Sequence, residues 1–539
     1  MLAAVAFLWL PATPTEAQKG HVVVGNEVRI NRASHWRVWQ GAASLVQISS
    51  TGEIRPLLLR KGVNAALDVA DHAITGTPGG VTAGSSPFTA RFTIDGNDAT
   101  SWGPAISDPL ADWWLEIDLG RLVVAQKIII RFADETEGDP FLQFKVLGWR
   151  QPPPRSTTTY TLAGTRIPRF WEIGRTTRPN KTQRVFEFEP RPTEGADAAF
   201  VGDPLERLQL IATHSDSSRA FEVSAVEHAA LRADRKGAVD YYRRTQSGSV
   251  RQVTQAEYDG FAEEQQGPIR YYRQEIPRIA EIEVITVGDN INLGLLDRSG
   301  TAVIETSGGD LKDIAAVISD GDYSKGHNGS IFSKTYEYLE DLGGLFWVDT
   351  MHYLTDGASS IDALSVDISD GSRAPDGSIR YDPVGESNVL GTSGHSSSKG
   401  IRFRELHMEP AKVRYVRARF SNPLSGLSYI GFTEVMIYGE GYVPGVELTS
   451  DLIELGQSKN LIAIEWLGDM PEGTRIQLQT RTGGQPREVT TYHDAAGNAV
   501  TESRYQRLPT SKRGEITTHP EPGEDWSPWS VAYSRSGAE

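Results

Sequence analysis

Cysteine is absent from all 539 residues of the chain. Without it there is no disulfide bond, no thiolate metal site and no cysteine nucleophile. If the protein is exported, its folding free energy must therefore come from the burial of side chains alone. Exported chains without cysteine are common in bacteria, so this composition favours a bacterial extracellular protein.

A long apolar run that could cross a membrane is also missing. The run Met1–Leu10 is about as long as the apolar core of a signal peptide and too short to span a bilayer. Small residues at Thr15 and Ala17 suit signal peptidase, although the usual positive charge before the run is lacking, which leaves open a start further upstream. We predict a signal peptide at residues 1–17, an extracellular or cell-surface location, and no transmembrane span.

The chain has fewer basic than acidic residues. Lys and Arg number 54 against 70 Asp and Glu, which gives a formal net charge of −16 and a pI near 5.3. A negative surface repels phosphate backbones, so we expect no nucleic-acid partner. The same balance suits a soluble protein or one that binds calcium.

Recognisable enzyme signatures are lacking as well. The sequence contains no Gly-x-Ser-x-Gly elbow, no His-Glu-x-x-His helix, no phosphate-binding loop and no dinucleotide-binding fingerprint. A pair of carboxylates for glycoside hydrolysis stays open, because 70 acidic residues give many pairs and only geometry decides. We predict no catalytic residue and a protein that is not an enzyme.

The sequence does contain one pattern that occurs twice. Each copy has an Asp-Gly turn, then an apolar strand that ends at Asp-Leu-Gly, and far downstream a Glu-containing strand that ends in glycine. These three parts lie at 94–102, 114–120 and 283–288 in the first copy, and at 318–322, 338–343 and 434–439 in the second. A long self-similar unit indicates one domain type used twice.

Strand signals along the chain are short and separated by Pro and Gly, which is typical of antiparallel sandwiches. We therefore predict an all-β chain of tandem antiparallel β-sandwiches. The predicted order is a strand-rich lead-in at 18–81, a first sandwich at 82–290 with an insertion at 233–275, a second sandwich at 291–445 and a further unit at 446–539. The final unit lacks the signal of a closing strand, so we expect the sequence to be a fragment of a longer protein.

The repeated pattern resembles the discoidin family, also called the coagulation-factor type C (F5/8 type C) domain, whose members are galactose-binding-like jelly rolls. The first copy carries the residues typical of the family: Asp95, Gly96, Thr100, Trp102, Trp114, Asp118, Leu119, Gly120, Glu283 and Gly288. The second copy has Lys325 and His327 where the family has Thr and Trp. The resemblance implies two discoidin-like jelly rolls, and this departure puts a site in the second loop in doubt.

The unit at 446–539 is similar to a fibronectin type III sandwich. It has strand signals at Leu461–Trp466 and Arg475–Arg481, and its Trp526–Ser530 run resembles the tryptophan motif of cytokine-receptor modules. We predict a partial fibronectin type III-like sandwich here.

Oxygen ligands crowd the first Asp-Gly loop. Asp95, Asn97, Asp98 and Thr100 lie close together in the sequence, and a hard cation takes six to eight oxygen ligands, backbone carbonyls included. The discoidin resemblance implies a calcium ion in this loop, with Glu283 of the last strand closing the site. The alternative is an Asx turn whose side chains cap the backbone. The corresponding acidic residues of the second copy are Asp320, Asp322 and Glu434.

The resemblance also implies a sugar site. Members of the family bind glycans on loops at one end of the sandwich, where an aromatic ring stacks on the sugar beside Arg, His or Asn. The candidates in this chain are Trp102, Tyr323, His327 and Asn328. The alternative places Trp102 in the core and leaves the other three as solvated loop residues.

The insertion contains two runs of Tyr and Arg, Tyr241–Arg244 and Arg270–Arg273. Tyr and Arg are enriched at binding surfaces, so an interface is one interpretation. We favour two adjacent strands of a hairpin, with Arg side chains over Tyr rings. Between the runs, Thr254 and Glu257 have the spacing of a capping box, which predicts the start of a short helix.

Together these features predict an exported, non-catalytic protein that binds a glycan or another cell-surface polymer through discoidin-like loops, with calcium fixing one loop. Protein partners are also open. Two other functions remain as alternatives: a structural spacer in a surface layer or appendage, and an accessory region of a longer extracellular enzyme.

Overall fold

The computed structural model describes residues 20–41, 45–74, 76–151, 169–190, 204–305, 311–328, 335–355, 363–384, 402–421, 431–495 and 499–538. The predicted signal peptide at 1–17 lies outside these residues. The chain forms two compact units, one of Ala43–Gln47 and Arg55–Val446, the other of Met1–Ala42, Ile48–Ile54 and Glu447–Glu539. Antiparallel strands dominate both units, so the all-β prediction is confirmed. Among the described residues no helix is both long and apolar enough to cross a membrane.

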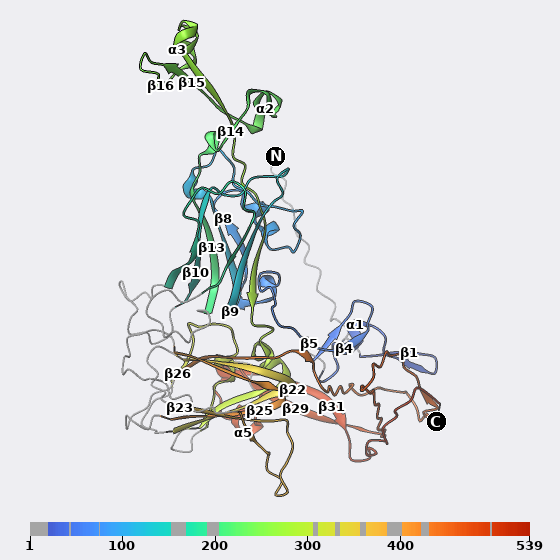
Figure 1. Cartoon of the computed structure of the whole chain (residues 1–539). Coiled ribbons are helices and arrows are strands. Elements are labelled where there is room, and N and C mark those ends of the chain that lie inside the picture. Colours follow the sequence, from blue (N-terminus) through green and yellow to red (C-terminus); the bar gives the residue numbers. More distant parts are fainter. Residues whose placement is uncertain are drawn as a thin grey trace, which may run out of the picture. The chain divides into compact units, whose positions relative to one another are not determined.

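The first sandwich is built around one long strand, β9 (Trp114–Phe132). The N-terminal half of β9 pairs with β8 (Gly80–Ala83) and β13 (Pro204–His214), and that sheet continues through β10 (Gln143–Arg150) to β11 (Arg169–Arg175). The C-terminal half of β9 pairs with β12 (Val185–Phe188) and β18 (Ile279–Thr286). Because β9 belongs to both sets of strands, it ties them together (Figure 1).

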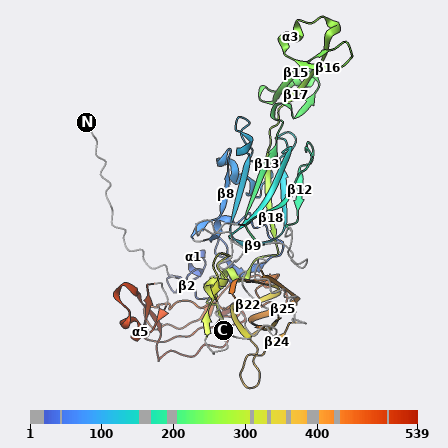
Figure 2. The ribbon, with the colours of Figure 1, turned by 90° about the vertical axis from the view of Figure 1, so that its left-hand side faces the viewer.

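The second sandwich repeats this plan around β22 (Thr335–Thr355), which pairs with β25 (Arg402–Ser421) along most of its length (Figure 2). One end of β22 also pairs with β19 (Thr301–Glu305), and the other end pairs with β26 (Gly431–Tyr438). The remaining elements of this sandwich are β20 (Leu311–Asp313), α4 (Ala315–Ile318), β21 (His327–Asn328), β23 (Ala363–Ser369) and β24 (Asp382–Pro383).

The Asp-Leu-Gly motif does not end a strand, as the sequence predicted, but bends one. Both β9 and β22 run through the motif, and the glycines have positive φ, 66° at Gly120 and 71° at Gly343. The aspartate two residues earlier holds the bend, since Asp118 Oδ1 accepts the Gly120 N–H at 3.0 Å and Asp341 Oδ1 accepts the Gly343 N–H at 2.9 Å. Both strands continue through the bend, since β13 pairs with β9, and β25 with β22, on both sides of it. The other neighbour of β22 changes from β19 before the bend to β26 after it.

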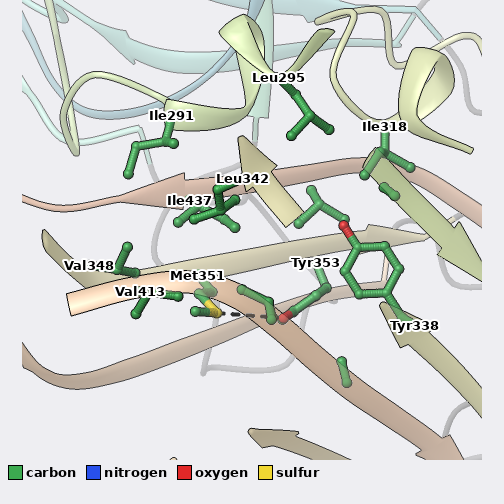
Figure 3. Packing of buried hydrophobic residues seen from close by; sticks show 14 of the residues in the cluster. Ile291, Leu295, Ile318, Tyr338, Leu342, Val348, Met351, Tyr353, Val413 and Ile437 are labelled. Carbon is green, nitrogen blue, oxygen red and sulfur yellow. Dashed lines mark hydrogen bonds between the residues drawn. The ribbon is translucent and has the colours of Figure 1, made fainter. Parts of the chain in front are cut away.

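Each sandwich has its own hydrophobic core. The first core includes the fully buried Trp102, Phe141 and Phe144. The second core surrounds Tyr338 and Tyr353, and the Tyr353 hydroxyl lies 3.5 Å from the Met351 sulfur (Figure 3). Burying a large side chain of this kind stabilises a fold by roughly 1.5–3 kcal/mol, so these cores account for the stability that disulfides cannot supply.

The insertion forms a separate four-stranded sheet, in the order β14 (Phe221–Val223), β17 (Gln266–Arg273), β15 (Lys236–Arg244) and β16 (Val250–Val253). The two Tyr runs lie on β15 and β17, which pair, and the Arg270 guanidinium lies 5.4 Å from the Tyr242 ring centroid. The two runs thus lie on adjacent paired strands, as predicted, but these strands do not form a hairpin, because β16 and α3 lie between them in the sequence. The capping box of Thr254 and Glu257 is also confirmed at the start of α3 (Gln255–Asp259).

This insertion is itself a repeat. Val223 of β14 pairs with Tyr271 of β17, and Val253 of β16 pairs with Tyr241 of β15. Val253 lies 30 residues after Val223 (253 − 223), and Tyr271 lies 30 residues after Tyr241 (271 − 241). The helix α2 (Ala225–Ala230) has the same capping box as α3, formed by Ser224 and Glu227. The sheet therefore consists of two strand–helix–strand repeats, each contributing an edge strand to the other.

A third copy of the same motif lies in the other unit. It comprises β29 (Pro486–Asp494), β30 (Ala499–Val500), α5 (Glu502–Arg507) and β31 (Arg513–Pro522). In this copy the Tyr505 hydroxyl donates to the Gly514 carbonyl at 3.0 Å, as the Tyr258 hydroxyl donates to the Gly267 carbonyl at 2.9 Å. These shared contacts establish a small recurring module that the sequence analysis had not recognised.

The rest of the C-terminal unit differs from the predicted strands. Only Ala463–Ile464 (β28) forms a strand in the first predicted segment, and it pairs with β32 (Gly537–Ala538). The segment Arg475–Arg481 runs beside the Trp526–Ser530 motif, where the Thr480 N–H donates to Ser530 Oγ at 3.1 Å. The Arg481 guanidinium lies 4.5 Å from the Trp529 ring centroid. The described part of this unit thus shows one three-stranded sheet and short strand pairs, and the fibronectin type III likeness stays a prediction.

The remaining short elements complete the chain. They are β1 (Val22–Val24), β2 (Glu27–Arg29), α1 (Ala33–Trp36), β3 (Val46–Ile48), β4 (Ile54–Pro56), β5 (Leu58–Leu59), β6 (Ala73–Ile74), β7 (Thr77–Pro78) and β27 (Gly441–Tyr442).

The bend in β9 yields a test with a matched control. A Cβ atom at Gly120 would lie 2.5 Å from the His72 carbonyl oxygen, whereas Gly62, with a similar φ of +61°, has open space around it. Both Gly→Ala variants carry the strain of a positive φ, about 1–2 kcal/mol. We expect Gly120→Ala to lower the melting temperature clearly more than Gly62→Ala in calorimetry. Equal shifts would contradict the role of the bend.

Candidate functional site

The first Asp-Gly loop has the geometry of an Asx turn. Gly96 takes a φ of +72°, Asp95 Oδ1 accepts the Asn97 N–H at 3.0 Å, and the Thr100 hydroxyl lies 2.8 Å from Asp95 Oδ2. Asn97 Oδ1 likewise accepts the Ala99 N–H at 3.1 Å. These contacts gather the oxygens of Asp95, Asn97 and Thr100 in one exposed turn.

A buried carboxyl group lies beneath this loop. Glu281 is only 3% exposed, and its Oε1 accepts the Gly96 N–H at 3.3 Å. Its Oε2 is buried and has no hydrogen-bond partner. Burial raises the pKa of Glu281 to about 7, and the nearby charges of Asp95 and Asp98 act in the same direction. A buried acceptor without a donor beside two more carboxyl groups is an environment that a cation would stabilise.

Glu283, the residue predicted to close the calcium site, lies elsewhere. Its Oε1 accepts hydrogen bonds from Arg131 Nε at 2.9 Å and Arg131 Nη2 at 2.7 Å. The strand register explains the difference from the prediction. Trp102 forms a β-bridge with Ile279, and His327, its counterpart in the second copy, pairs with Phe432. Glu281 and Glu434 each lie two residues after the partner in their own strand. The two glutamates therefore occupy equivalent positions.

Counting back from the terminal glycine missed this equivalence. Gly288 lies two residues further from Glu281 than Gly439 lies from Glu434, so the same count from the two glycines does not reach equivalent glutamates. Glu281, and not Glu283, is the glutamate beneath the first loop.

The second Asp-Gly loop contains its own cation. Lys325, five residues after Asp320 as Thr100 is after Asp95, places its Nζ 2.9 Å from Asp320 Oδ2 and 3.2 Å from Asp322 Oδ2. The hydrogen bond to Asp320 raises the pKa of Lys325. Glu434 is fully buried, and burial together with Asp320 raises its pKa well above the ordinary value. The ammonium group of Lys325 thus pairs with Asp320 and Asp322, whereas both carboxyl oxygens of Glu434 are buried without a hydrogen-bond partner.

The metal prediction can be compared with the side chains present. Within the part of the chain that the structure describes, no group of three or more His, Asp and Glu side chains is arranged to hold a metal ion. A cation in the first loop would therefore need oxygens from Asn97, Thr100 and the backbone as well as carboxylates. Calcium accepts such mixed oxygen ligands.

The four predicted sugar-binding residues do not form one platform. Trp102 has no exposed surface, and its Nε1–H donates to the Ser85 carbonyl at 2.9 Å. A ring without an exposed face cannot stack on a sugar, so the structure assigns Trp102 to the core, as the alternative interpretation held. His327 and Asn328 form strand β21, and their side chains lie outside the described part of the structure.

Tyr323 is also fully buried. It belongs to a small apolar cluster that joins the two sandwiches, together with Leu122, Val124, Leu354, Met436 and Tyr438. The Arg150 guanidinium lies 5.5 Å from the Tyr323 ring centroid, and the Leu122 N–H donates to the Gly321 carbonyl at 2.8 Å. The second loop is therefore a joint between sandwiches, and Tyr323 has no face to offer a ligand.

An exposed face that the sequence analysis did not single out lies on β10 and β11. Trp149 and Phe170 are directly opposite each other there, and Phe170 is 54% exposed. A groove of about 350 Å³ lies further along the same strands, lined by Gln143, Lys145, Arg175, Thr176, Thr177 and Thr213. The signal in the sequence was the alternation of buried and polar positions from 143 to 149, but the pairing partner on β11 was not readable.

No family model and no curated protein matches the chain. Solved structures do. A carbohydrate-binding module of a Clostridium perfringens protein, in complex with GalNAc-β-1,3-galactose, is 13% identical, with 28% of this chain and 100% of that chain covered and a TM-score of 0.21. A chitosan-binding module of a chitosanase/glucanase from Paenibacillus sp. IK-5 is 17% identical, covering 28% and 99%, with a TM-score of 0.21. A GH29 fucosidase from Ruminococcus gnavus is 14% identical, with 28% of this chain but only 27% of the fucosidase covered and a TM-score of 0.21.

The internal cation of the second loop can be tested by replacing it. Lys325→Met leaves Asp320 and Asp322 without their ammonium partner, so we expect a melting temperature lower by about 2 °C near neutral pH. High salt should shrink the difference, because salt screens a half-exposed pair. Lys312→Met is the control, since Lys312 is an exposed lysine of the same sandwich. If both variants melt alike, Lys325 does not stabilise the loop.

Proposed function

We propose that the protein is a non-catalytic carbohydrate-binding protein that acts outside the cell or at its surface. The observation that carries the proposal is the outward face of β10 and β11, where a polar groove lies on the same strands as the exposed Phe170 and the half-buried Trp149. The groove is open to solvent and lined by polar side chains that can bind the hydroxyl groups of a sugar, and aromatic rings stack on the apolar face of a pyranose. The discoidin likeness of the repeated sandwich supports the same class of ligand.

The proposal assigns binding rather than catalysis to this groove. Its lining consists of amide, hydroxyl, ammonium and guanidinium groups, and none of the six lining residues is Asp, Glu or His. General acid–base catalysis of glycoside cleavage ordinarily uses a pair of carboxyl groups. Export is proposed from the apolar segment at 1–17 and the absence of cysteine from the sequence.

A structural spacer is the second candidate. It is supported by the apolar cluster of Leu122, Val124, Tyr323, Leu354, Met436 and Tyr438, which joins the two sandwiches. Such a joint would help a chain to hold other domains apart. It does not require a ligand, and binding experiments therefore separate the two candidates.

A glycan array tests the main proposal. The full chain is applied to neutral and acidic glycans, and heat-denatured protein serves as the control. We expect selective binding that the denatured protein lacks. If no glycan retains the native protein even at high concentration, the carbohydrate proposal is contradicted and the spacer is favoured.

We also propose that calcium binds at the first loop, held by Asp95, Asn97, Asp98 and Thr100 together with Glu281. The orphaned buried oxygen of Glu281 supports this assignment. A bound calcium ion would fix the turn against β18 and offset the repulsion among the carboxylates. Glu283 is left out of the ligand set because Arg131 already occupies its Oε1.

Two glutamine variants separate the two glutamates. Millimolar calcium should raise the melting temperature of the wild type, because a ligand that binds only the native state stabilises it. Glu281→Gln should abolish this rise and Glu283→Gln should retain it.

Because the pKa of Glu281 is raised to about 7, the calcium-free folded state binds a proton that the unfolded chain releases. Stability without calcium should therefore fall between about pH 4.5 and pH 7, and the calcium-dependent rise should be larger at about pH 8 than at about pH 6. A calcium effect that Glu283→Gln removes and Glu281→Gln keeps would contradict the assignment.

A further inference from the structure

The groove on β10 and β11 faces solvent because the strands alternate. Phe144 and Val146 of β10 are fully buried in the first core, so Gln143, Lys145 and Trp149 point to the other side of the sheet. Arg175 lies on the neighbouring strand β11, and Thr213 lies on β13 at the other side of β10. Three strands thus contribute to one outward surface.

The charges in this groove are of one sign. Lys145 and Arg175 are direct cross-strand partners, and both line the groove. Like charges directly opposite each other destabilise a sheet, because their Cβ atoms lie only about 5 Å apart. Glu172 relieves Arg175 in part, with a carboxylate oxygen 2.6 Å from its Nε. Among the described residues no carboxylate pairs with Lys145.

The positive charge of the groove is opposite in sign to the net charge of the chain. Acidic residues exceed basic ones by 16 (70 − 54), yet the groove has two cations and no acidic lining residue. Its other lining groups are one amide and three hydroxyls. The Thr176 hydroxyl already accepts the Phe144 N–H at 2.9 Å, so Gln143, Thr177 and Thr213 are the groups that suit the hydroxyl groups of a sugar. An anionic group in the groove would remove the repulsion between Lys145 and Arg175 through charge-assisted hydrogen bonds.

The aromatic pair extends the surface along the same strands. Trp149 lies four residues beyond Lys145, a distance of about 13 Å along an extended strand. The Trp149 and Phe170 ring centroids are 6.0 Å apart, and the Arg207 guanidinium lies 4.5 Å from the Trp149 ring centroid. Arg207 is itself paired with Glu116 and Asp118, so its charge is compensated, unlike that of Lys145. A chain of several sugar residues could reach from the cations to the aromatic rings.

We propose that the outward face of β10, β11 and β13 is a binding site for an anionic polysaccharide. Lys145 and Arg175 bind its carboxylate or sulfate group, and Gln143, Thr177 and Thr213 bind its hydroxyl groups. Phe170 with Trp149 stacks on a sugar further along. This inference rests on the proposed carbohydrate-binding function and narrows its ligand class. A nucleic acid would carry the anionic groups too, but the net charge of −16 opposes a continuous phosphate backbone.

Binding of four polymers to the full chain tests the site. Polygalacturonate supplies carboxylates, dextran sulfate supplies sulfates, dextran is neutral and polyglutamate is an acidic peptide. We expect the wild type to bind one of the two anionic polysaccharides, or both, more tightly than dextran and polyglutamate. Lys145→Gln should weaken that binding about tenfold or more, the size expected for one lost charge-assisted hydrogen bond. Phe170→Ala should weaken it as well.

Lys127→Gln is the matched control. It removes the same charge from an exposed lysine of the same sandwich, whose partner is Glu187 at 2.8 Å. Thermal melting of each variant establishes that it is folded. If Lys127→Gln weakens binding as much as Lys145→Gln does, the attraction is general and the site is overturned.

The remaining outcomes each decide against the inference in a different way. Equal binding of dextran, unaffected by Lys145→Gln, keeps the carbohydrate function and rejects the anionic ligand. Binding of polyglutamate that depends on Lys145 assigns the groove to an acidic peptide. Failure to bind any of the four polymers rejects the inference, while the glycan array decides separately whether the proposed function survives.

Discussion

The structure depends on a bent strand that is used twice. β9 and β22 each pass through Asp-Leu-Gly, where Gly120 and Gly343 have positive φ, and each strand gains further neighbours beyond the bend, β12 and β18 for β9 and β26 for β22. Because each strand has neighbours on both sides of the bend, the cores around Phe144 and Tyr353 close without disulfides.

The same scaffold has been put to different uses in its two copies. In the first copy the Asp-Gly loop is exposed, and a buried glutamate, Glu281, lies beneath it with an unpaired oxygen. In the second copy Lys325 provides a positive charge, and Tyr323 is buried against the first sandwich. One loop thus retains an environment suited to a cation, whereas the other has become part of a joint.

Much of the fold could be predicted from the sequence because its signals are local. The alternation in β9 and β10, the Asp-Gly turns and the capping box at Thr254 all depend on neighbouring residues. The site depended on long-range pairing and was less predictable. The bridge between Trp102 and Ile279 places Glu281, and not Glu283, beneath the loop, and Tyr323 is buried against Arg150 and Leu122, which are far away in the sequence. The repeated module of 221–273 was readable in the sequence, since Tyr-Tyr-Arg recurs at 241 and 271, but it was overlooked.

We propose that the outward sheet face of β10, β11 and β13, and not the Asp-Gly loops, binds the ligand. A crystal structure of the protein with an oligogalacturonate or a sulfated oligosaccharide tests it most directly. We expect electron density for a sugar across β10 and β11, with an anionic group between Lys145 and Arg175 and a sugar ring against Phe170. Sugar bound instead at the loop of Asp95 to Thr100, with the β10–β11 face empty, would contradict the account.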